Sequence, residues 1–220
     1  MGSMIEFARP DGGRTKGYLA DAGKKRPGIV VIQEWWGLND QIKSVADRFA
    51  KTGITALAPD LFKGKVTAKP DEASHLMNNL DFPDATHQDL QGAVKHLKSL
   101  CPKVAVTGFC MGGALAIAAG VHVPEIDAAI CLYGIPPREF ADPTKIQVPF
   151  QGHFATKDDW ITPAKVRELE DSLKKSGVEY EIYSYNAHHA FCNDRRPEVY
   201  DAAAAKLVWD RSLKFLAAKL

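Results

Sequence analysis

One cysteine of the chain lies in a motif that is typical of a catalytic nucleophile. The segment Gly108-Phe109-Cys110-Met111-Gly112-Gly113 follows an apolar run at residues 103–107 and precedes an alanine-rich segment. A strand, a sharp turn and a helix in this order form a nucleophile elbow, whose small residues let strand and helix approach closely. The thiol of Cys110 would lie at a helix N-terminus, where the helix dipole favours the thiolate. The N–H group of Met111 would face the same space and stabilise an oxyanion.

A nucleophilic thiol needs a base, and the base needs an acid that orients it. Downstream of Cys110, two loops that follow predicted strands carry such groups: Asp158-Asp159 after residues 148–153 and His188-His189 after residues 179–184. The chain order nucleophile, acid, histidine is that of α/β-hydrolases. Carboxylates and histidines are common in loops when taken singly. Three such groups in this order, each past the carboxyl end of a predicted strand, predict a Cys-His-Asp triad.

The elements that must position these groups alternate between strands and helices along nearly the whole chain. Continuous apolar runs predict strands buried on both faces, and apolar residues at helical spacing predict helices. We predict a hairpin at residues 6–20 and strands at 28–33, 54–58, 103–107, 127–132, 148–153 and 179–184. Helices are expected at residues 40–52, 71–80, 85–100, 111–120, 163–175 and 197–218. This alternation predicts an α/β fold with a mostly parallel central sheet and helices on both faces.

The length of the chain indicates one domain, and its charge excludes some classes of binding partner. A chain of 220 residues fits one domain, which we place at residues 4–220 because Met1-Gly2-Ser3 is typical of a cloning remnant. Lys and Arg number 28 and Asp and Glu 27, so the formal net charge is +1. A near-neutral chain without a basic block is not expected to bind nucleic acid or an anionic membrane. The uncharged stretch at residues 104–124 is long enough to span a bilayer, but its clustered glycines indicate a buried strand, turn and helix.

The cysteines indicate a reducing compartment. Cys101, Cys110, Cys131 and Cys192 form no C-x-x-C pair and no cluster with zinc-binding spacing. Unclustered cysteines without a signal-peptide pattern predict free thiols and a cytoplasmic location. No helix shows an unmatched apolar face, so we expect a monomer.

Several side chains near the predicted strand ends are candidates for the site. Glu34 directly follows the apolar run at residues 28–33, where a buried carboxylate is costly unless it is paired, which favours a functional role. The aromatic side chains of Trp35, Trp36, Trp160 and Phe191 are candidates for the pocket wall, with ordinary core packing as the alternative for each of them.

These segments together resemble the dienelactone hydrolase family, whose type activity is that of carboxymethylenebutenolidase. The resemblance covers residues 5–216 and is carried by Gln33-Glu34-Trp35-Trp36-Gly37-Leu38-Asn39, Pro59-Asp60-Leu61, Gly108-Phe109-Cys110-Met111-Gly112-Gly113, Asp158-Asp159-Trp160 and His189-Ala190-Phe191. It implies an α/β-hydrolase fold, a Cys-His-Asp triad, and no metal or organic cofactor.

The resemblance also implies roles for individual residues. Cys110 matches the nucleophile and His189 the base, since the family pattern H-x-F places Phe191 two residues on. Asp158 matches the acid, with Asp159 as the neighbouring alternative. Glu34 matches a buried glutamate that contacts the resting thiol and helps to convert it to thiolate. The backbone N–H of Trp35 matches the second donor of the oxyanion hole.

Two positions depart from the family pattern. The family's type enzymes hold the carboxylate of dienelactone with arginines, one of them four residues after the catalytic histidine, where this chain has Asn193. The second arginine is also missing from the segment before residue 71. An amide lacks both the charge and the fork geometry of a guanidinium, so Asn193 in the pocket disfavours dienelactone as the preferred substrate. Arg195, Arg196 and Lys69 are possible substitutes.

We therefore expect a cysteine-dependent hydrolase of small-molecule esters or lactones that works through an acyl-thioester. A cysteine amidotransferase or deglycase-like enzyme is disfavoured, because no His-x-Glu sequence follows Cys110. A binding or redox-sensing protein on a hydrolase scaffold, without turnover, is the alternative from a different class.

Overall fold

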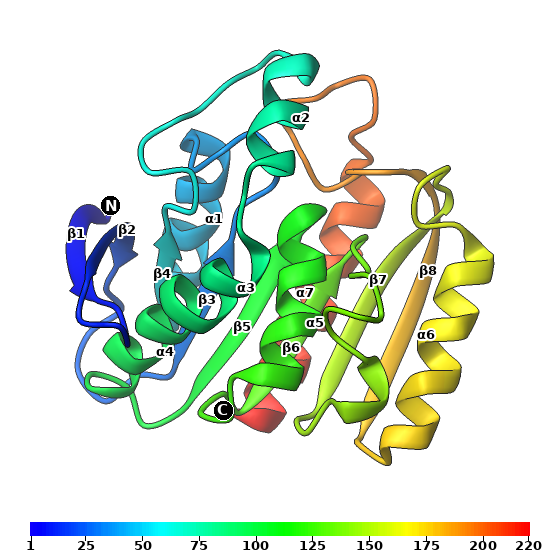
Figure 1. Cartoon of the computed structure of the whole chain (residues 1–220). Coiled ribbons are helices and arrows are strands. Elements are labelled where there is room, and N and C mark those ends of the chain that lie inside the picture. The colour runs from blue at the N-terminus through cyan, green and yellow to red at the C-terminus, as the bar shows by residue number, and fades with distance from the viewer.

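Eight strands form one mixed sheet in the computed structural model, which describes all of residues 1–220 (Figure 1). Their order across the sheet is β1-β2-β4-β3-β5-β6-β7-β8. The bounds are β1 Ser3–Ala8, β2 Arg14–Ala20, β3 Gly28–Ile32, β4 Thr55–Pro59, β5 Val104–Phe109, β6 Ala128–Leu132, β7 Phe150–Lys157 and β8 Tyr180–His188. Strand β2 is antiparallel to both of its neighbours, β1 and β4, and the strands from β4 across the sheet to β8 are all parallel. The predicted mostly parallel sheet is confirmed.

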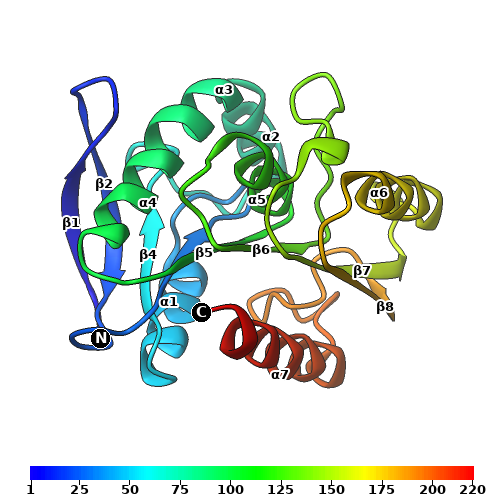
Figure 2. The ribbon, with the colours of Figure 1, turned by 90° about the horizontal axis from the view of Figure 1, so that it is seen from below.

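Helices cover both faces of this sheet, as Figure 2 shows. One face carries α1 Asp40–Lys51 and α7 Ala202–Lys219, and the other carries α2 Pro70–Asn78, α3 Phe82–Asp84, α4 Gln91–Lys98, α5 Met111–His122 and α6 Pro163–Ser176. A π-helical segment, Ala85–Leu90, joins α3 to α4, and a short 3₁₀ helix spans Pro143–Lys145. None of the helices combines the length and apolar character that a membrane crossing requires.

Alternation along the buried strands divides the core into two layers. In β3, Val30 and Ile32 pack with α4 and α5, whereas Ile29 and Val31 pack on the opposite face with α1 and α7. Successive side chains of a strand point to opposite faces of a sheet, so a strand covered on both sides has to be apolar throughout. This is why the uninterrupted β-branched run of β3 predicts its central place.

The structure corrects the expected bounds of three elements. The last helix begins at Ala202 instead of residue 197, because the Asp201 side chain caps it by accepting the N–H of Ala204 at 2.9 Å. Strands β7 and β8 run on to Lys157 and His188, further than expected. Asp158 and His189 therefore follow the ends of their strands directly.

The N-terminal residues take part in the fold. Ser3 begins β1, and the N–H of Gly2 donates to the Asp47 side chain of α1 at 2.8 Å. Gly2 and Ser3, which we expected to lie outside the domain as a cloning remnant, therefore contact the rest of the fold.

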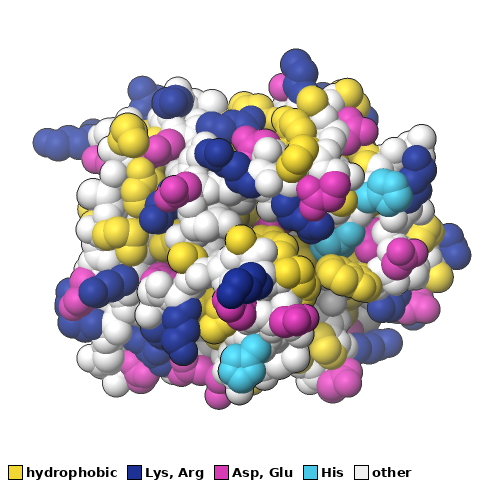
Figure 3. All heavy atoms as spheres, turned by 90° about the horizontal axis from the view of Figure 1, so that it is seen from above, with side chains coloured by type: hydrophobic (Ala, Val, Ile, Leu, Met, Phe, Trp, Pro, Cys, Tyr) yellow, Lys and Arg dark blue, Asp and Glu magenta, His cyan; other side chains and the backbone are white.

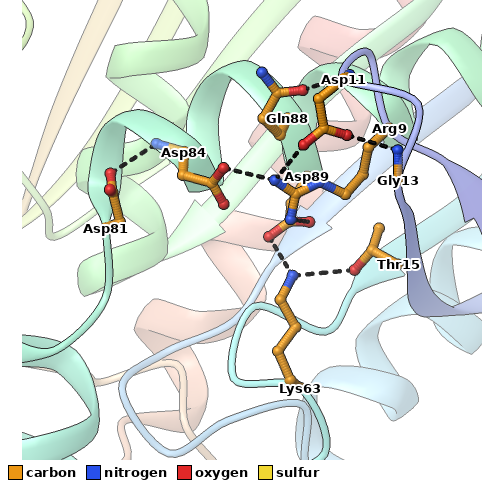
Figure 4. A network of polar contacts seen from close by, with 9 residues as sticks. All are labelled: Arg9, Asp11, Gly13, Thr15, Lys63, Asp81, Asp84, Gln88 and Asp89. Carbon is orange, nitrogen blue, oxygen red and sulfur yellow. Dashed lines mark hydrogen bonds and ion pairs between the residues drawn. The ribbon is translucent and has the colours of Figure 1, made fainter.

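A cluster of ion pairs links the hairpin, the π-helical segment and the turn after β4 (Figure 4). The buried carboxylate of Asp89 lies 2.6 Å from Lys63 Nζ and 3.4 Å from Arg9 Nη1, and Arg9 Nη2 lies 2.6 Å from Asp84. A buried carboxylate has to be paired, because desolvation penalises its charge. Lys63 starts the loop whose Thr67 N–H donates to the Trp36 carbonyl at 3.1 Å. The cluster therefore holds the base of a loop that reaches the carboxyl edge of the sheet.

His153, which lies near the predicted acid loop, is a buried structural residue of β7. Its ring contacts the Tyr185 hydroxyl at 2.8 Å and the Gln151 side chain at 2.9 Å. Burial, with a smaller contribution from the charge of Arg211, lowers the pKa of His153 to about 3.

This lowered pKa predicts a loss of stability in acid. The unfolded chain binds a proton near the ordinary histidine pKa of 6.5, whereas the folded chain resists it down to about 3. The free energy of unfolding should therefore fall as the pH drops from 6.5 to 3, by about 1.4 kcal/mol per pH unit at most from this group. Urea unfolding of His153→Gln should show a flatter pH dependence in this range, while the exposed-site variant His75→Gln should match the wild type. An unchanged slope in His153→Gln would contradict the assignment.

Candidate active site

Cys110 occupies a strained turn between β5 and α5. Its backbone angles are φ 54° and ψ −115°, a left-handed conformation that non-glycine residues rarely adopt. Glycines on both sides make the turn possible, since a Cβ on Gly108 would overlap the Gly112 carbonyl oxygen, and one on Gly112 would lie 2.5 Å from the Gln33 carbonyl oxygen. The segment therefore has the geometry of a nucleophile elbow.

Asp158 and His189 form a close pair beside this elbow. His189 Nδ1 lies 2.6 Å from Asp158 Oδ2, and the other carboxylate oxygen accepts the N–H groups of Trp160 and Ile161, each at 2.9 Å. Burial would raise the pKa of Asp158, but the hydrogen bond from His189 and the backbone N–H groups outweigh it, so the pKa is lowered. The neighbouring Asp159 is exposed to solvent. The geometry thus favours Asp158 over Asp159 as the partner of the imidazole.

The second ring nitrogen of His189 is buried and has no hydrogen-bond partner. The indole of Trp160 and the phenol of Tyr133 pack edge-on against the imidazole, with ring centroids at 4.9 and 5.2 Å. No hydrogen bond joins this nitrogen to the Cys110 thiol. Catalytic hydrogen bonds are often long without substrate, and they tighten when a ligand binds.

The environment of Cys110 keeps its sulfur in the thiol form. Burial raises the pKa of the Cys110 thiol, the negative charge of Glu34 raises it further, and the N–H of Met111 opposes both. The N–H of Trp35 donates to no acceptor within the chain. The predicted oxyanion donor at Trp35 therefore remains available to a ligand.

Glu34 is fully buried behind the elbow. One carboxyl oxygen accepts a hydrogen bond from Asn193 Nδ2 at 2.7 Å, and the other lies 3.4 Å from the Tyr133 hydroxyl. Burial raises the pKa of Glu34, although the hydrogen bond from Asn193 and the charge of His189 act in the opposite direction. Asn193, which we expected to line the substrate pocket, thus turns its amide toward Glu34.

The aromatic side chains that we expected to line the pocket differ in their exposure to solvent. Trp35 lies 5.0 Å from Trp36 and 5.7 Å from Trp160 between ring centroids, and Trp160 is 54% exposed although it is a large apolar side chain. Phe191 is instead completely buried, packed between the rings of Tyr133 and Tyr185. The three tryptophans therefore pack against one another, with Trp160 outermost, and Phe191 belongs to the core beneath the site.

A pocket of about 330 Å³ lies beside Trp36. Its wall includes Trp36, Asn193, Arg195 and Arg196, together with the loop at residues 67–70. Figure 3 looks onto this carboxyl edge of the sheet, where hydrophobic side chains and a histidine gather near the middle of the face. No group of three or more His, Cys, Asp or Glu side chains that could hold a metal ion occurs in the structure.

Sequence reasoning missed Tyr133, which is fully buried and has a positive φ of 39°. The only available signal was its place directly after a predicted strand, the position that the other site residues share. An aromatic residue directly after a strand can belong either to the core or to the site, and the sequence does not distinguish the two.

The elbow after β5, with an acid after β7 and a histidine after β8, places this fold among the α/β-hydrolases. The profile of the dienelactone hydrolase family matches residues 15–220, and the chain belongs to that family.

Curated relatives and solved structures agree with this assignment. The chain is 36% identical to Protein usf of Aquifex pyrophilus, over 98% of its own length and 97% of the relative. It is 34% identical to the "Putative carboxymethylenebutenolidase" of Aquifex aeolicus, with the same two coverages. The crystal structure of a "Putative Dienelactone Hydrolase" from Klebsiella pneumoniae superposes with a TM-score of 0.82 at 25% identity, and the match covers 99% of both chains. The expected family and the α/β-hydrolase fold are confirmed.

Proposed function

We propose that this protein is a cysteine-dependent hydrolase of ester or lactone bonds in small molecules, with Cys110, His189 and Asp158 as its triad. The observation that carries the proposal is the 2.6 Å contact between Asp158 and His189 beside the strained Cys110 turn. An imidazole with one nitrogen fixed by a buried carboxylate and the other unpaired is arranged to accept a proton from a nucleophile.

The proposed reaction proceeds through an acyl-thioester. His189 takes the proton of Cys110, and the thiolate attacks the carbonyl carbon while the N–H groups of Met111 and Trp35 stabilise the oxyanion. The carbon–oxygen bond of the ester breaks, and the leaving alkoxide takes the proton from His189. Water, deprotonated by His189, then attacks the thioester and releases the acid and the Cys110 thiol. No step requires a metal or an organic cofactor.

The nucleophile limits the substrates. If the thiolate leaves the tetrahedral intermediate more readily than the alkoxide or amine of the substrate, the attack is reversed. Simple esters and amides are therefore poor substrates. Activated esters and enol-lactones carry good leaving groups and are better matched. The adjoining rings of Trp35, Trp36 and Trp160 would provide apolar surfaces for such compounds.

A time course with p-nitrophenyl acetate separates this proposal from a binding or redox-sensing role. A hydrolase releases p-nitrophenol over many turnovers, and pretreatment with iodoacetamide stops the release. A single burst of one equivalent followed by no release would instead indicate a protein that traps the acyl group without turnover.

Substrate charge is the subject of a further prediction. The cations that could replace the missing arginine are engaged or exposed: Arg196 pairs with Glu198 at 2.8 Å, Lys69 pairs with Glu72 at 2.9 Å, and the side chain of Arg195 is 69% exposed. We expect neutral activated aryl esters to have kcat/KM values at least as high as carboxylated dienelactone.

The matched variant is Asn193→Arg. A guanidinium should improve the carboxylated lactone relative to the neutral ester by about 10- to 100-fold, the worth of a charge-assisted hydrogen bond. A wild-type preference for dienelactone by several orders of magnitude would contradict the prediction and point to Arg195, Arg196 or Lys69 as the anchor.

A further inference from the structure

A second pocket lies on the face of the sheet that α1 and α7 cover (Figure 2). It measures about 150 Å³, which is room for several water molecules or one small ligand. Its wall includes Gln41 and Arg48 of α1, Trp209 of α7, and Cys192 from the segment between β8 and α7. This α1–α7 pocket shares no residue with the pocket beside Trp36 or with the proposed triad.

Gln41 brings a polar atom without a partner to the α1–α7 pocket. Its side chain is only 5% exposed, and its amide oxygen Oε1 is buried and accepts no hydrogen bond. Helix capping does not account for this amide, because Asn39 caps α1 by accepting the N–H of Ile42 at 3.2 Å. A buried polar atom without a partner costs free energy, so it marks a position at which a ligand gains a hydrogen bond.

The guanidinium of Arg48 is a fixed cation in the same wall. Its Cζ lies 4.1 Å from the centroid of the Trp209 ring, and Trp209 packs in turn against Phe49 with ring centroids 4.7 Å apart. Stacking on an indole fixes the plane of a guanidinium and leaves the N–H groups at its edge free to bind an anion. Arg48 is therefore oriented before any ligand arrives.

Arg48 is also the one charged residue of this wall that has no ionic partner in the chain. Lys206 pairs with Asp210 at 2.6 Å. Asp194 lies 3.9 Å from Arg195. The α1–α7 pocket thus carries one uncompensated positive charge, which suits an anion with a single negative charge.

The spacing of Gln41 and Arg48 limits the shape of the ligand. They are seven residues apart in α1 and lie on one face of the helix, with about 10 Å of helix axis between their Cα atoms. The wall between them is apolar and includes Val45 and, from α7, Ala205. A ligand that pairs with both needs an anionic group at one end, a hydrogen-bonding group at the other and a short apolar chain between them.

We propose that the α1–α7 pocket binds a small hydroxycarboxylate, whose carboxylate pairs with Arg48 and whose terminal hydroxyl bonds to the Gln41 amide. A hydroxyl group both donates and accepts hydrogen bonds, so it supplies the donor that the amide oxygen lacks. Hydrolysis of a lactone releases a compound of this class. The binding itself depends on residues outside the proposed triad and does not require the proposed function.

Calorimetric titration measures the binding, with 4-hydroxybutyrate as the probe. Butyrate lacks the hydroxyl group, 1,4-butanediol lacks the carboxylate, and inorganic phosphate has charge without the chain. We expect saturable binding of 4-hydroxybutyrate and about 3- to 10-fold weaker binding of butyrate, the worth of one neutral hydrogen bond. Butanediol and phosphate should show no binding at the same concentrations.

Three variants assign the two ends of the ligand. Arg48→Gln removes a charge-assisted contact and should weaken the binding of 4-hydroxybutyrate by about 10- to 100-fold. Gln41→Leu keeps the size of the side chain and should abolish the difference between 4-hydroxybutyrate and butyrate. Lys51→Gln is the matched control, because it removes an exposed positive charge from the last turn of the same helix and should bind like the wild type.

Two-dimensional NMR of the ¹⁵N-labelled protein locates the ligand. The indole N–H signal of Trp209 should shift during the titration, whereas the signals of Trp35, Trp36 and Trp160 should stay in place. Protein whose Cys110 has been alkylated with iodoacetamide should bind 4-hydroxybutyrate as tightly as untreated protein.

Three results would overturn the inference: no saturable binding to the wild type, unchanged binding in Arg48→Gln, or shifts confined to the indoles beside the proposed active site. Equal binding of phosphate, or of butyrate by the wild type, would reject the hydroxycarboxylate as the ligand. If Gln41→Leu fails to fold, the comparison of the two acids and the Arg48→Gln titration still decide. None of these measurements involves turnover, so their failure leaves the hydrolase proposal standing, and an inactive protein that binds 4-hydroxybutyrate would retain the site.

Discussion

Cys110→Ala is expected to abolish ester hydrolysis and to leave the fold intact. The thiol is the only group of the proposed mechanism that forms a covalent bond with the substrate, so its removal leaves only binding and the oxyanion donors. In comparable triads, loss of the nucleophile costs roughly 10⁴-fold or more in rate. Initial rates with p-nitrophenyl acetate measure the loss, and circular dichroism with thermal unfolding measures the fold.

The control for this variant is Cys101→Ala. Cys101 is buried just before β5 begins, at the end of the strand opposite to Cys110. Its replacement should lower stability slightly, through a small cavity, and should leave the rate near that of the wild type. A Cys110→Ala protein that keeps most of the wild-type rate would show that the nucleophile lies elsewhere.

Asp158→Asn has the second-largest expected effect. An amide keeps the size of the carboxylate, but it cannot favour the imidazole tautomer that leaves Nε2 free to accept a proton, so kcat/KM should fall by up to about 10⁴-fold. Because the pKa of Asp158 is lowered, the carboxylate that orients His189 persists at neutral pH, and its contribution should disappear only in acid.

Asp159→Asn is the matched control, since it makes the same chemical change one residue along the chain. Asp159 is exposed, and the carboxylate that contacts His189 belongs to Asp158, so the loss of kcat/KM in Asp159→Asn should be small. Equal losses in the two variants, or a larger loss at Asp159, would reject Asp158 as the acid.

Much of the fold follows from the sequence because its elements are strongly patterned. The continuous apolar residues of β3 are all buried only in a strand that is covered on both faces. Ile42, Val45 and Phe49 lie on one buried face only if α1 is a helix. The ends of helices and strands are set by individual contacts, which the pattern of apolar residues in the sequence does not reveal. The start of α7 depends on the Asp201 cap, and the end of β8 at His188 depends on its pairing with Lys157 of β7.

Some features of the candidate site can also be predicted from the sequence, and others cannot. The elbow and the order of acid and histidine are local features, and the structure places Asp158 against His189 as the chain order predicts. The environment of Glu34 is not local, because its contact with Asn193 joins residues 159 positions apart. The sequence identifies Asn193 as the replacement for an arginine, but only the folded chain shows that its amide is turned toward Glu34. Tyr133 could not be foreseen, since its contacts with His189 and Glu34 join residues that are far apart in the chain.

The central claim is that the Cys110 thiol carries the acyl group during hydrolysis. The most direct test is to mix the wild-type protein with excess p-nitrophenyl acetate, quench it in acid during turnover, and map the acetylated peptide by mass spectrometry. We predict one acetyl group on the peptide that contains Cys110, removable by hydroxylamine as expected of a thioester. An acetyl group on a serine, a threonine or another cysteine, or continued turnover with no acylated peptide at any time, would contradict the account.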